Sequence, residues 1–356
     1  MNEEKNLSAL HVAVMYVGAI MGAGFASGRE TWQFFGVFGE KGRTGAVIFA
    51  ALFMIIGLAT SYIARKTQTN DMGSIIVPGK NKKAEAFVGY FMAVALASVM
   101  VVMTAAGGSL LNQQFGLHPA IGGALIAVLV IATVLGEFQR MSKVFRYVMP
   151  VLCIAMIITC ITVIIKNPVA VEGGDEIKPS PVAPNWLLAC LLYTSYNVMA
   201  MIAIVGTSSI KTKDAKTAMA GTAAGGVFLG LLAMMILVTV QRDMPFSQAM
   251  DLPVLGYADR ISKTLGLMYT IILFCAVYSA ATSNFYGFTT KLKEGPSKKK
   301  IIIATGILAF ALGLVGFKKI VEYLSPIMGY AGMAIIIMLL WNFVLVWKKE
   351  HKKNET

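Results

Sequence analysis

Charged residues are scarce in this chain. Aspartate, glutamate, lysine and arginine make up 14% of its 356 residues, where a soluble domain has roughly 25%. Apolar residues make up 57%, and the mean hydropathy is +0.70. This composition excludes an ordinary soluble domain and predicts an integral membrane protein surrounded by a lipid bilayer.

Cysteine and histidine are also few, and each scarcity excludes a class of site. All four cysteines lie inside apolar runs, where we expect small buried side chains and no disulfide framework: Cys153, Cys160, Cys190 and Cys275. No H-E-x-x-H zinc pair occurs among the three histidines. We therefore predict that the chain is not an enzyme and that it carries no cofactor.

Positive charge, in contrast, is in excess, with a net charge of +13. Such an excess also occurs in nucleic-acid-binding proteins, but here the basic residues stand in short loops between apolar runs, which favours a role in membrane orientation and no nucleic-acid partner. A spanning helix needs about 20 mostly apolar residues. Ten ranges qualify: 9–38 (interrupted), 43–65, 84–111, 119–137, 143–166, 185–209 (interrupted), 215–241, 261–290, 301–317 and 319–348.

The distribution of lysine and arginine predicts the orientation. Ten spans place both termini on the same side of the membrane. Twenty-one of the 31 basic residues lie on that side, nine lie on the opposite side, and Arg29 lies within the first range. The positive-inside rule therefore predicts that both termini lie in the cytoplasm. The segment Met1–Asn6 is net acidic, so we expect no cleaved signal peptide.

The first range contains an unusual stretch, Gly22–Glu30, with three glycines and two charges. Each glycine costs a helix about 1 kcal/mol relative to alanine, and charges at membrane depth are functional by default. Broken helices survive at this depth only beside protein or a watery cavity. The stretch therefore predicts a broken helix and a binding site, although glycines spaced in this way also occur at close helix packing.

The organisation of the chain suggests two halves within a single membrane domain, residues 1–356. The proline-rich segment 167–184 is an exposed extracytoplasmic connector between two groups of five spans. The first group covers residues 7–166 and the second covers 185–348, followed by a cytoplasmic tail, 349–356.

The two halves predict a second broken helix. Because each half has an odd number of spans, a repeated second half would be inverted, and paired interruptions mark transporter binding sites. The sixth range contains five consecutive residues with polar groups, Tyr193, Thr194, Ser195, Tyr196 and Asn197. We predict that they break the helix and form one wall of the site.

The eighth range carries three hydroxyl side chains at i, i+3 and i+4: Ser279, Thr282 and Ser283. They share one helical face, and small hard cations prefer oxygen ligands. A cation site is one interpretation, and hydrogen bonding to neighbouring helices or to the preceding turn is the other.

Glu322 stands near the outer end of the tenth range. Because Arg29 follows the first break on the outward side, the two charges are candidates for an outer gate that also includes Glu30. The alternative is a surface glutamate that extends to water. Residues 242–260 are expected to form a short helix over the outer face, and His118 is expected to cap the helix after it.

Two stretches resemble a known family. Gly22–Glu30, together with Pro326–Tyr330 in the last span, is similar to the YkvI-type family of bacterial membrane proteins. That family in turn resembles the LeuT-fold superfamily, which includes sodium symporters and amino acid–polyamine–organocation carriers. The resemblance covers nearly the whole chain and implies an all-α, five-plus-five inverted repeat with broken first and sixth helices.

The resemblance also implies a sodium site, formed by the carbonyls of Gly18 and Met21 together with Ser279, Thr282 and Ser283. Some proton-coupled relatives place a lysine from the fifth helix there, but no basic residue occurs between Arg146 and Lys166. The resemblance therefore favours sodium. Glu30 has no counterpart in the usual signature of the symporters' first helix.

Together these observations predict a cation-coupled, alternating-access transporter of a small amino acid-like or polar organic solute, with an anionic group held at the helix end in the first break. Two alternatives stay open: a solute sensor that does not transport, and a proton-coupled transporter that uses Glu30. The predicted substrate site contains Gly22, Ala23, Gly24, Phe25, Ser27, Tyr193, Thr194, Ser195, Tyr196 and Asn197.

Overall fold

The computed structural model describes residues 7–79, 81–136, 138–166, 171 and 177–354. Within these residues, the regular secondary structure is helical. Each of the ten predicted ranges contains helix. Beyond the first range the helices are α4 (Glu40–Thr67), α6 (Lys82–Phe115), α7 (Pro119–Leu135), α8 (Phe138–Lys166), α9 (Trp186–Ile210), α10 (Ala215–Val240), α13 (Lys263–Thr289), α14 (Pro296–Gly313) and α15 (Phe317–Asn354).

Among the described residues, six helices are long and apolar enough to cross a membrane: α4, α6, α9, α10, α13 and α15. Large apolar side chains also cover much of the outer surface. Phe87, Ile165 and Ile337 are 74%, 71% and 66% exposed. Apolar surface of this extent is unfavourable in water and suits contact with lipid chains.

The first range is broken, as the glycines predict. It consists of α1 (Ala9–Ile20), α2 (Ala23–Ala26) and α3 (Arg29–Phe34), followed by a 3-10 turn at Gly36–Phe38. Gly28, between α2 and α3, has a φ of 77°, in the left-handed region that other residues adopt only with strain.

The sixth range is not broken, and this prediction was wrong. Helix α9 runs without interruption from Trp186 to Ile210. Its polar side chains bond to the helix itself: the hydroxyls of Thr194 and Ser195 donate to the carbonyls of Cys190 and Leu191. Because each group finds an acceptor one turn earlier, the polar stretch needs no water and no break in the helix.

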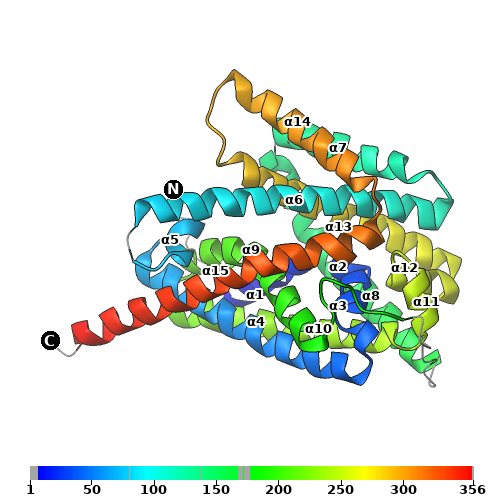
Figure 1. The fold of residues 1–356 in the computed structure, drawn as a ribbon, viewed down its shortest axis with the longest axis horizontal. Helices are drawn as coiled ribbons and strands as arrows, with labels where there is room; N and C mark the ends of the chain where they lie inside the picture. The colour runs from blue at the N-terminus through cyan, green and yellow to red at the C-terminus, as the bar shows by residue number, and fades with distance from the viewer. Residues whose placement is uncertain (1–6, 80, 137, 167–170, 172–176, 355–356) are drawn as a thin grey trace.

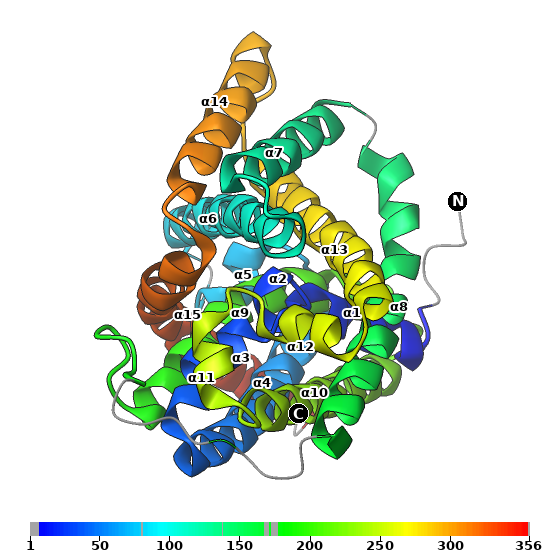
Figure 2. The same cartoon turned by 90° about the vertical axis from the view of Figure 1, so that its right-hand side faces the viewer.

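Helices α1, α2, α3 and α9 lie near the centre of the bundle, and the longer helices surround them (Figures 1 and 2). Two short helices, α11 (Met244–Ala249) and α12 (Pro253–Ile261), cover one end (Figure 2). They lie in the segment 242–260 for which a short helix was predicted. The short helix α5 (Met72–Ile76) lies at the opposite end (Figure 1).

The beginning and the end of the described chain share one end of the bundle. The Leu7 amide donates to the carbonyl of Lys211 after α9, and Arg65 donates to Thr212. Lys66 and Glu350 form an ion pair of 2.6 Å. Residues 349–354 of the predicted tail continue helix α15, whereas most of the predicted connector, 167–170 and 172–176, lies outside the described residues.

Candidate functional site

The first break releases backbone groups from their usual helical partners. The Met21 amide still donates to Val17, but the Gly22 amide donates to Ile20 at 2.6 Å. In a continuous helix the Gly22 amide would bond the carbonyl of Gly18. The Gly18 carbonyl therefore loses its ordinary donor, which leaves it able to accept from a ligand.

The second break, between α2 and α3, is closed by neighbouring helices. The Val254 amide of α12 donates to the Ser27 carbonyl at 2.8 Å, and the Tyr269 hydroxyl of α13 donates to the Ala26 carbonyl at 2.6 Å. Since lipid offers no hydrogen bonds, these two donors stabilise the irregular backbone.

Glu30 lies directly after this second break and is 4% exposed. Its side chain folds back onto α2, and its carboxyl group lies against Gly24, as measured from an added Cβ there. The Tyr193 hydroxyl donates to Glu30 Oε2 at 3.2 Å. The Tyr193 ring is held among three phenylalanine rings with centroids 4.9 to 5.3 Å away: Phe34, Phe35 and Phe49.

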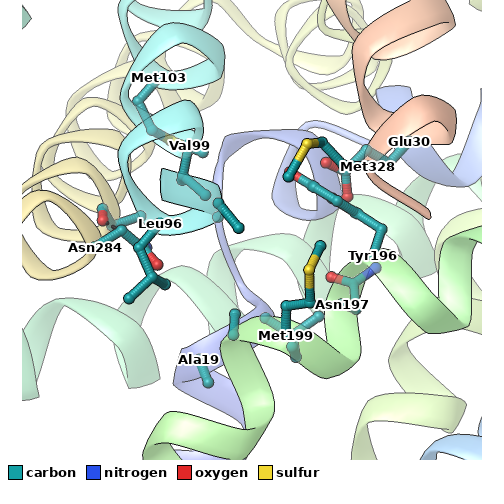
Figure 3. A pocket seen from close by; sticks show the side chains of 15 residues that line it. Ala19, Glu30, Leu96, Val99, Met103, Tyr196, Asn197, Met199, Asn284 and Met328 are labelled. Atoms are coloured by element: carbon teal, nitrogen blue, oxygen red, sulfur yellow. Dashed lines mark hydrogen bonds between the residues drawn. The ribbon is translucent and has the colours of Figure 1, made fainter. Parts of the chain in front are cut away.

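A cavity of about 50 Å³ lies beside the first break and joins five parts of the chain (Figure 3). Glu30 and Met328 meet on one side, above α9, while side chains from α6 face them (Figure 3). The cavity is lined by Ala19, Ile20, Gly22, Glu30, Ala95, Leu96, Val99, Met103, Tyr196, Asn197, Met199, Ala200, Ala280, Asn284 and Met328.

The predicted substrate residues divide into three groups around this cavity. Gly22, Tyr196 and Asn197 line it directly, and Tyr193 contributes through its hydrogen bond to Glu30. The remainder are buried but do not line the cavity: Ala23, Gly24, Phe25, Ser27, Thr194 and Ser195. The lining residues of α6, α13 and α15 were missed. Ala280, Asn284 and Met328 lie within or next to stretches that the sequence marked for other reasons, and nothing in the local sequence of α6 marks its lining residues.

The predicted cation ligands lie on two helices beside the cavity. Ser279 and Thr282 are buried, but Ser283 is exposed. The Thr282 hydroxyl donates to the Tyr278 carbonyl at 2.7 Å. The α13 residues that line the cavity are Ala280 and Asn284, so the shared face predicted for the three hydroxyls is not the face turned to it.

Arg29 is buried at the end of the bundle that α11 and α12 cover. Its Nη1 donates to the Met250 carbonyl at 3.2 Å and reaches that of Gln248 at 3.5 Å. Trp32 Nε1 and Lys318 Nζ also donate to Gln248, each at 2.7 Å. Residues of α3 and α15 therefore hold the loop between α11 and α12 in place.

Arg29 does not form the direct ion pair with Glu322 that the sequence suggested. Among the described residues, the ion pairs within 4.0 Å involve other side chains. Asp251 and Glu322 act on Arg29 only through their charge. The backbone carbonyls of Gln248 and Met250 accept from the Arg29 guanidinium instead.

Sequence comparisons identify two similar proteins of Bacillus subtilis (strain 168). The uncharacterized membrane protein YkvI is 25% identical over 341 residues, covering 95% of this chain and 97% of that protein. The uncharacterized protein YyaD is 22% identical over 344 residues, with coverages of 94% and 97%. No protein-family model matches the chain. The resemblance to YkvI-type proteins is thus confirmed.

Three solved structures are similar in fold. MhsT in complex with L-phenylalanine has a TM-score of 0.60 at 16% identity, covering 97% of this chain and 99% of that one. Mhp1 in its inward-facing conformation has a TM-score of 0.62 at 12% identity, covering 96% of this chain and 77% of that one. A manganese transporter of Eremococcus coleocola has a TM-score of 0.57 at 11% identity, covering 95% of this chain and 85% of that one. These neighbours have the LeuT fold, and this chain shares it.

Proposed function

We propose that this protein is a cation-coupled secondary transporter that moves a small polar organic solute by alternating access. The observation that carries the proposal is the cavity beside Gly22, where a released backbone and the buried carboxylate of Glu30 meet in a LeuT fold. LeuT-type proteins bind their solutes at such breaks near the middle of the membrane.

Helix packing supports a motion of two groups of helices. Helices α4, α9 and α10 contact one another and α1 packs against α9 and α10, whereas α6 contacts α7, α13 and α14 in a second group. The cavity lies between them, lined by α1 and α9 on one side and by α6 and α13 on the other. A rocking motion of one group against the other would open the site to each side in turn.

We propose sodium as the coupling ion, bound near the first break. The released carbonyl of Gly18 supports this assignment, as do the buried hydroxyls of Ser279 and Thr282. The ligand set proposed from the resemblance also includes Met21 and Ser283. Because Ser283 is exposed, the site requires α13 to turn slightly when the ion binds.

We also propose a bacterial inner membrane location with cytoplasmic termini. The end of the bundle near Leu7 and Glu350 carries Arg65, Lys66 and Lys349, and an excess of basic residues is typical of the cytoplasmic side. Helices α11 and α12 would then cover the outer face.

The decisive experiment measures transport by the purified chain in proteoliposomes. A panel of labelled small solutes is tested for uptake and for exchange with internal solute, with an inward gradient of sodium or of potassium. We expect sodium to accelerate the uptake of one solute class. Binding of a solute with neither uptake nor exchange would contradict transport and favour a sensor.

Glu30 supports proton coupling as a second candidate. It is a buried carboxyl group in the cavity wall, and the Tyr193 hydroxyl donates a hydrogen bond to it. Proton coupling predicts uptake driven by an inward pH gradient in the absence of sodium, and its loss in Glu30→Gln. Uptake that needs sodium and ignores the pH gradient would exclude this candidate.

A further inference from the structure

Most of the polar groups that line the cavity can accept a hydrogen bond from a ligand, and the Tyr196 hydroxyl can also donate. Asn197 and Asn284 each donate through Nδ2 to their own helix, to the carbonyls of Tyr193 at 2.9 Å and Ala280 at 2.8 Å. Their Oδ1 atoms are left to accept. Glu30 adds a carboxylate, and three methionine thioethers add weak acceptors. A ligand that matches this lining is a donor.

The charged groups that line the cavity are also of one sign only. Its lining contains the carboxylate of Glu30 and no lysine, arginine or histidine. The guanidinium of the adjacent Arg29 bonds instead to the carbonyls of Met250 and Gln248 and to the side chain of Gln33. A buried carboxylate is costly unless a cation or a set of donors compensates it. Tyr193 supplies one donor to Glu30, and a cationic ligand would supply the positive charge that the lining lacks.

The rest of the cavity limits the size and the polarity of the ligand. A water molecule needs about 10–15 Å³ of such volume, so a cavity of about 50 Å³ holds roughly three to five non-hydrogen atoms. Alanine, leucine, valine and methionine side chains form most of the wall. Such a wall suits a short alkyl group, and methionine adapts easily to its shape.

We propose that the solute is a small organic monocation, a primary aliphatic amine whose ammonium group binds Glu30. This inference rests on the proposed function and names its substrate class. An ammonium group has three N–H donors, which suit the carboxylate of Glu30 and amide oxygen acceptors such as that of Asn197. Its alkyl part suits the apolar side chains of the wall.

This assignment replaces the anionic group expected at the break. The carboxyl group of Glu30 already lies against Gly24, at the helix end where a solute carboxylate was predicted. An amino acid would therefore bring a second carboxylate next to the first, and like charges repel in a site of low dielectric constant. A divalent metal ion fits less well, because it needs more oxygen ligands than one carboxylate and two amides provide.

The first test is the thermal stability of the purified full-length protein. Methylammonium and ethylammonium are compared with acetamide, acetate and glycine, each in sodium and in potassium. Ligands that bind the folded state raise the melting temperature. We expect a rise that grows with concentration for the two amines only. In Glu30→Gln, the apparent affinity for them falls about tenfold to a hundredfold. Glu40→Gln, at an exposed position of α4, keeps the wild-type affinity.

A second measurement covers the case in which Glu30→Gln does not fold. A hydrophobic carbodiimide modifies buried carboxyl groups, and mass spectrometry locates the modification in the wild-type protein. We expect methylammonium to protect Glu30 and acetamide not to protect it. Equal protection by both, protection by sodium alone, or no protection and no stabilisation by any amine would each overturn the inference.

Transport of the same probes separates the two proposals. If a neutral or anionic solute is taken up equally by wild type and Glu30→Gln, the substrate class is wrong and the transporter proposal stands. If amines bind in a manner that depends on Glu30 but are neither taken up nor exchanged, the inference stands and transport is wrong.

Discussion

The carboxyl group of Glu30 occupies the space where a side chain of residue 24 would begin. A Cβ added to Gly24 would lie 2.0 Å from Oε1 of Glu30 and 2.1 Å from its Cδ. Both distances are far inside van der Waals contact, so only glycine leaves room for the acidic group. The pair thus links the glycine-rich stretch to the one charged residue of the cavity wall, and it explains why a glycine stands on α2.

Gly24→Ala tests this relationship. The methyl group forces the carboxyl group of Glu30 away from α2 and from Tyr193, and overpacking of this kind typically costs about 1–3 kcal/mol. We expect solute binding to weaken about tenfold or more while the protein still inserts and purifies, and Gly24→Leu to abolish transport. The matched control is Gly89→Ala in α6, where the nearest atom to an added Cβ is Lys291 Nζ at 3.5 Å. Equal affinity in the two alanine variants would contradict the arrangement.

Tyr193→Phe removes the donor to Glu30 but keeps the ring among its three phenylalanine neighbours. A hydrogen bond to a charged group contributes about 1.5–3 kcal/mol, so the carboxylate becomes less well held. We expect a loss of solute affinity of about tenfold with little change in the amount of folded protein. Tyr62→Phe in α4, whose ring packs on Phe343 and does not line the cavity, should bind the solute like the wild type.

The sequence predicted the bundle and the first break because both depend on local properties. Runs of apolar residues set the helices, and the glycines near Gly22 weaken one of them where it stands. The break in α9 was wrongly predicted, because polar side chains such as Thr194 and Ser195 can bond to the preceding turn. Whether they break a helix or bond within it depends on their surroundings, and a row of polar residues does not distinguish the two cases.

The cavity itself was only half predictable. Glu30 and Asn197 stand in stretches whose composition is unusual for a membrane helix, and both line the cavity. Met103 and Asn284 come from two other helices and resemble many residues elsewhere in the chain, and Met328 lies in the Pro326–Tyr330 stretch, which marked a family resemblance but no binding site. Their roles follow from the packing of distant segments, which a single sequence does not specify.

Arg29→Gln should loosen the cover formed by α11 and α12. The guanidinium holds the Met250 and Gln248 carbonyls, and its loss leaves Lys318 and Trp32 as the remaining donors to Gln248. We expect faster hydrogen exchange in residues 248–252 and no change in α5 at the opposite end. Lys319→Gln, at an exposed position next to Lys318 in α15, is the control. Unchanged exchange in Arg29→Gln would mean that the arginine does not hold the loop.

The contact between Asp71 and Lys291 predicts how the stability of the folded state depends on pH. Burial alone would raise the pKa of Asp71, but hydrogen bonds from Ser74 and Lys291 outweigh it and lower the pKa. The stabilisation that ionised Asp71 gives to the folded state is therefore complete above the unfolded-state pKa of about 3.9. This stabilisation is lost as the pH falls through the lower folded-state pKa. Because the pair is partly exposed, it contributes at most about 1 kcal/mol.

The observable is the hydrogen exchange of α5, which Asp71 caps. After correction for intrinsic rates, the protection should be constant between pH 5 and 8 and should fall below about pH 4. Asp71→Asn should remove this acid dependence and leave the pH profile of transport near neutrality unchanged. A change of that profile in Asp71→Asn would assign the coupling proton to this end of the bundle rather than to Glu30.

The sodium site is tested by removing the buried hydroxyls of α13. In the double variant Ser279→Ala with Thr282→Ala, two of the proposed oxygen ligands are lost, and we expect the sodium concentration for half-maximal uptake to rise at least about tenfold. The Thr282 hydroxyl also donates to the Tyr278 carbonyl, so a control must distinguish the loss of this helix hydrogen bond from the loss of an ion ligand. Thr162→Ala in α8 is the control, because the Thr162 hydroxyl makes the same bond, to Ile158.

Ser283→Ala, alone and combined with Thr282→Ala, decides whether α13 turns when the ion binds. Ser283 is exposed in the structure, so a site without any turn predicts that the single variant keeps the wild-type sodium dependence. The proposed site includes Ser283 and predicts a rise of several-fold, and loss of sodium dependence in the combined variant. Sodium dependence unchanged in every one of these variants would remove α13 from the site, and the coupling would then have to be sought at Glu30.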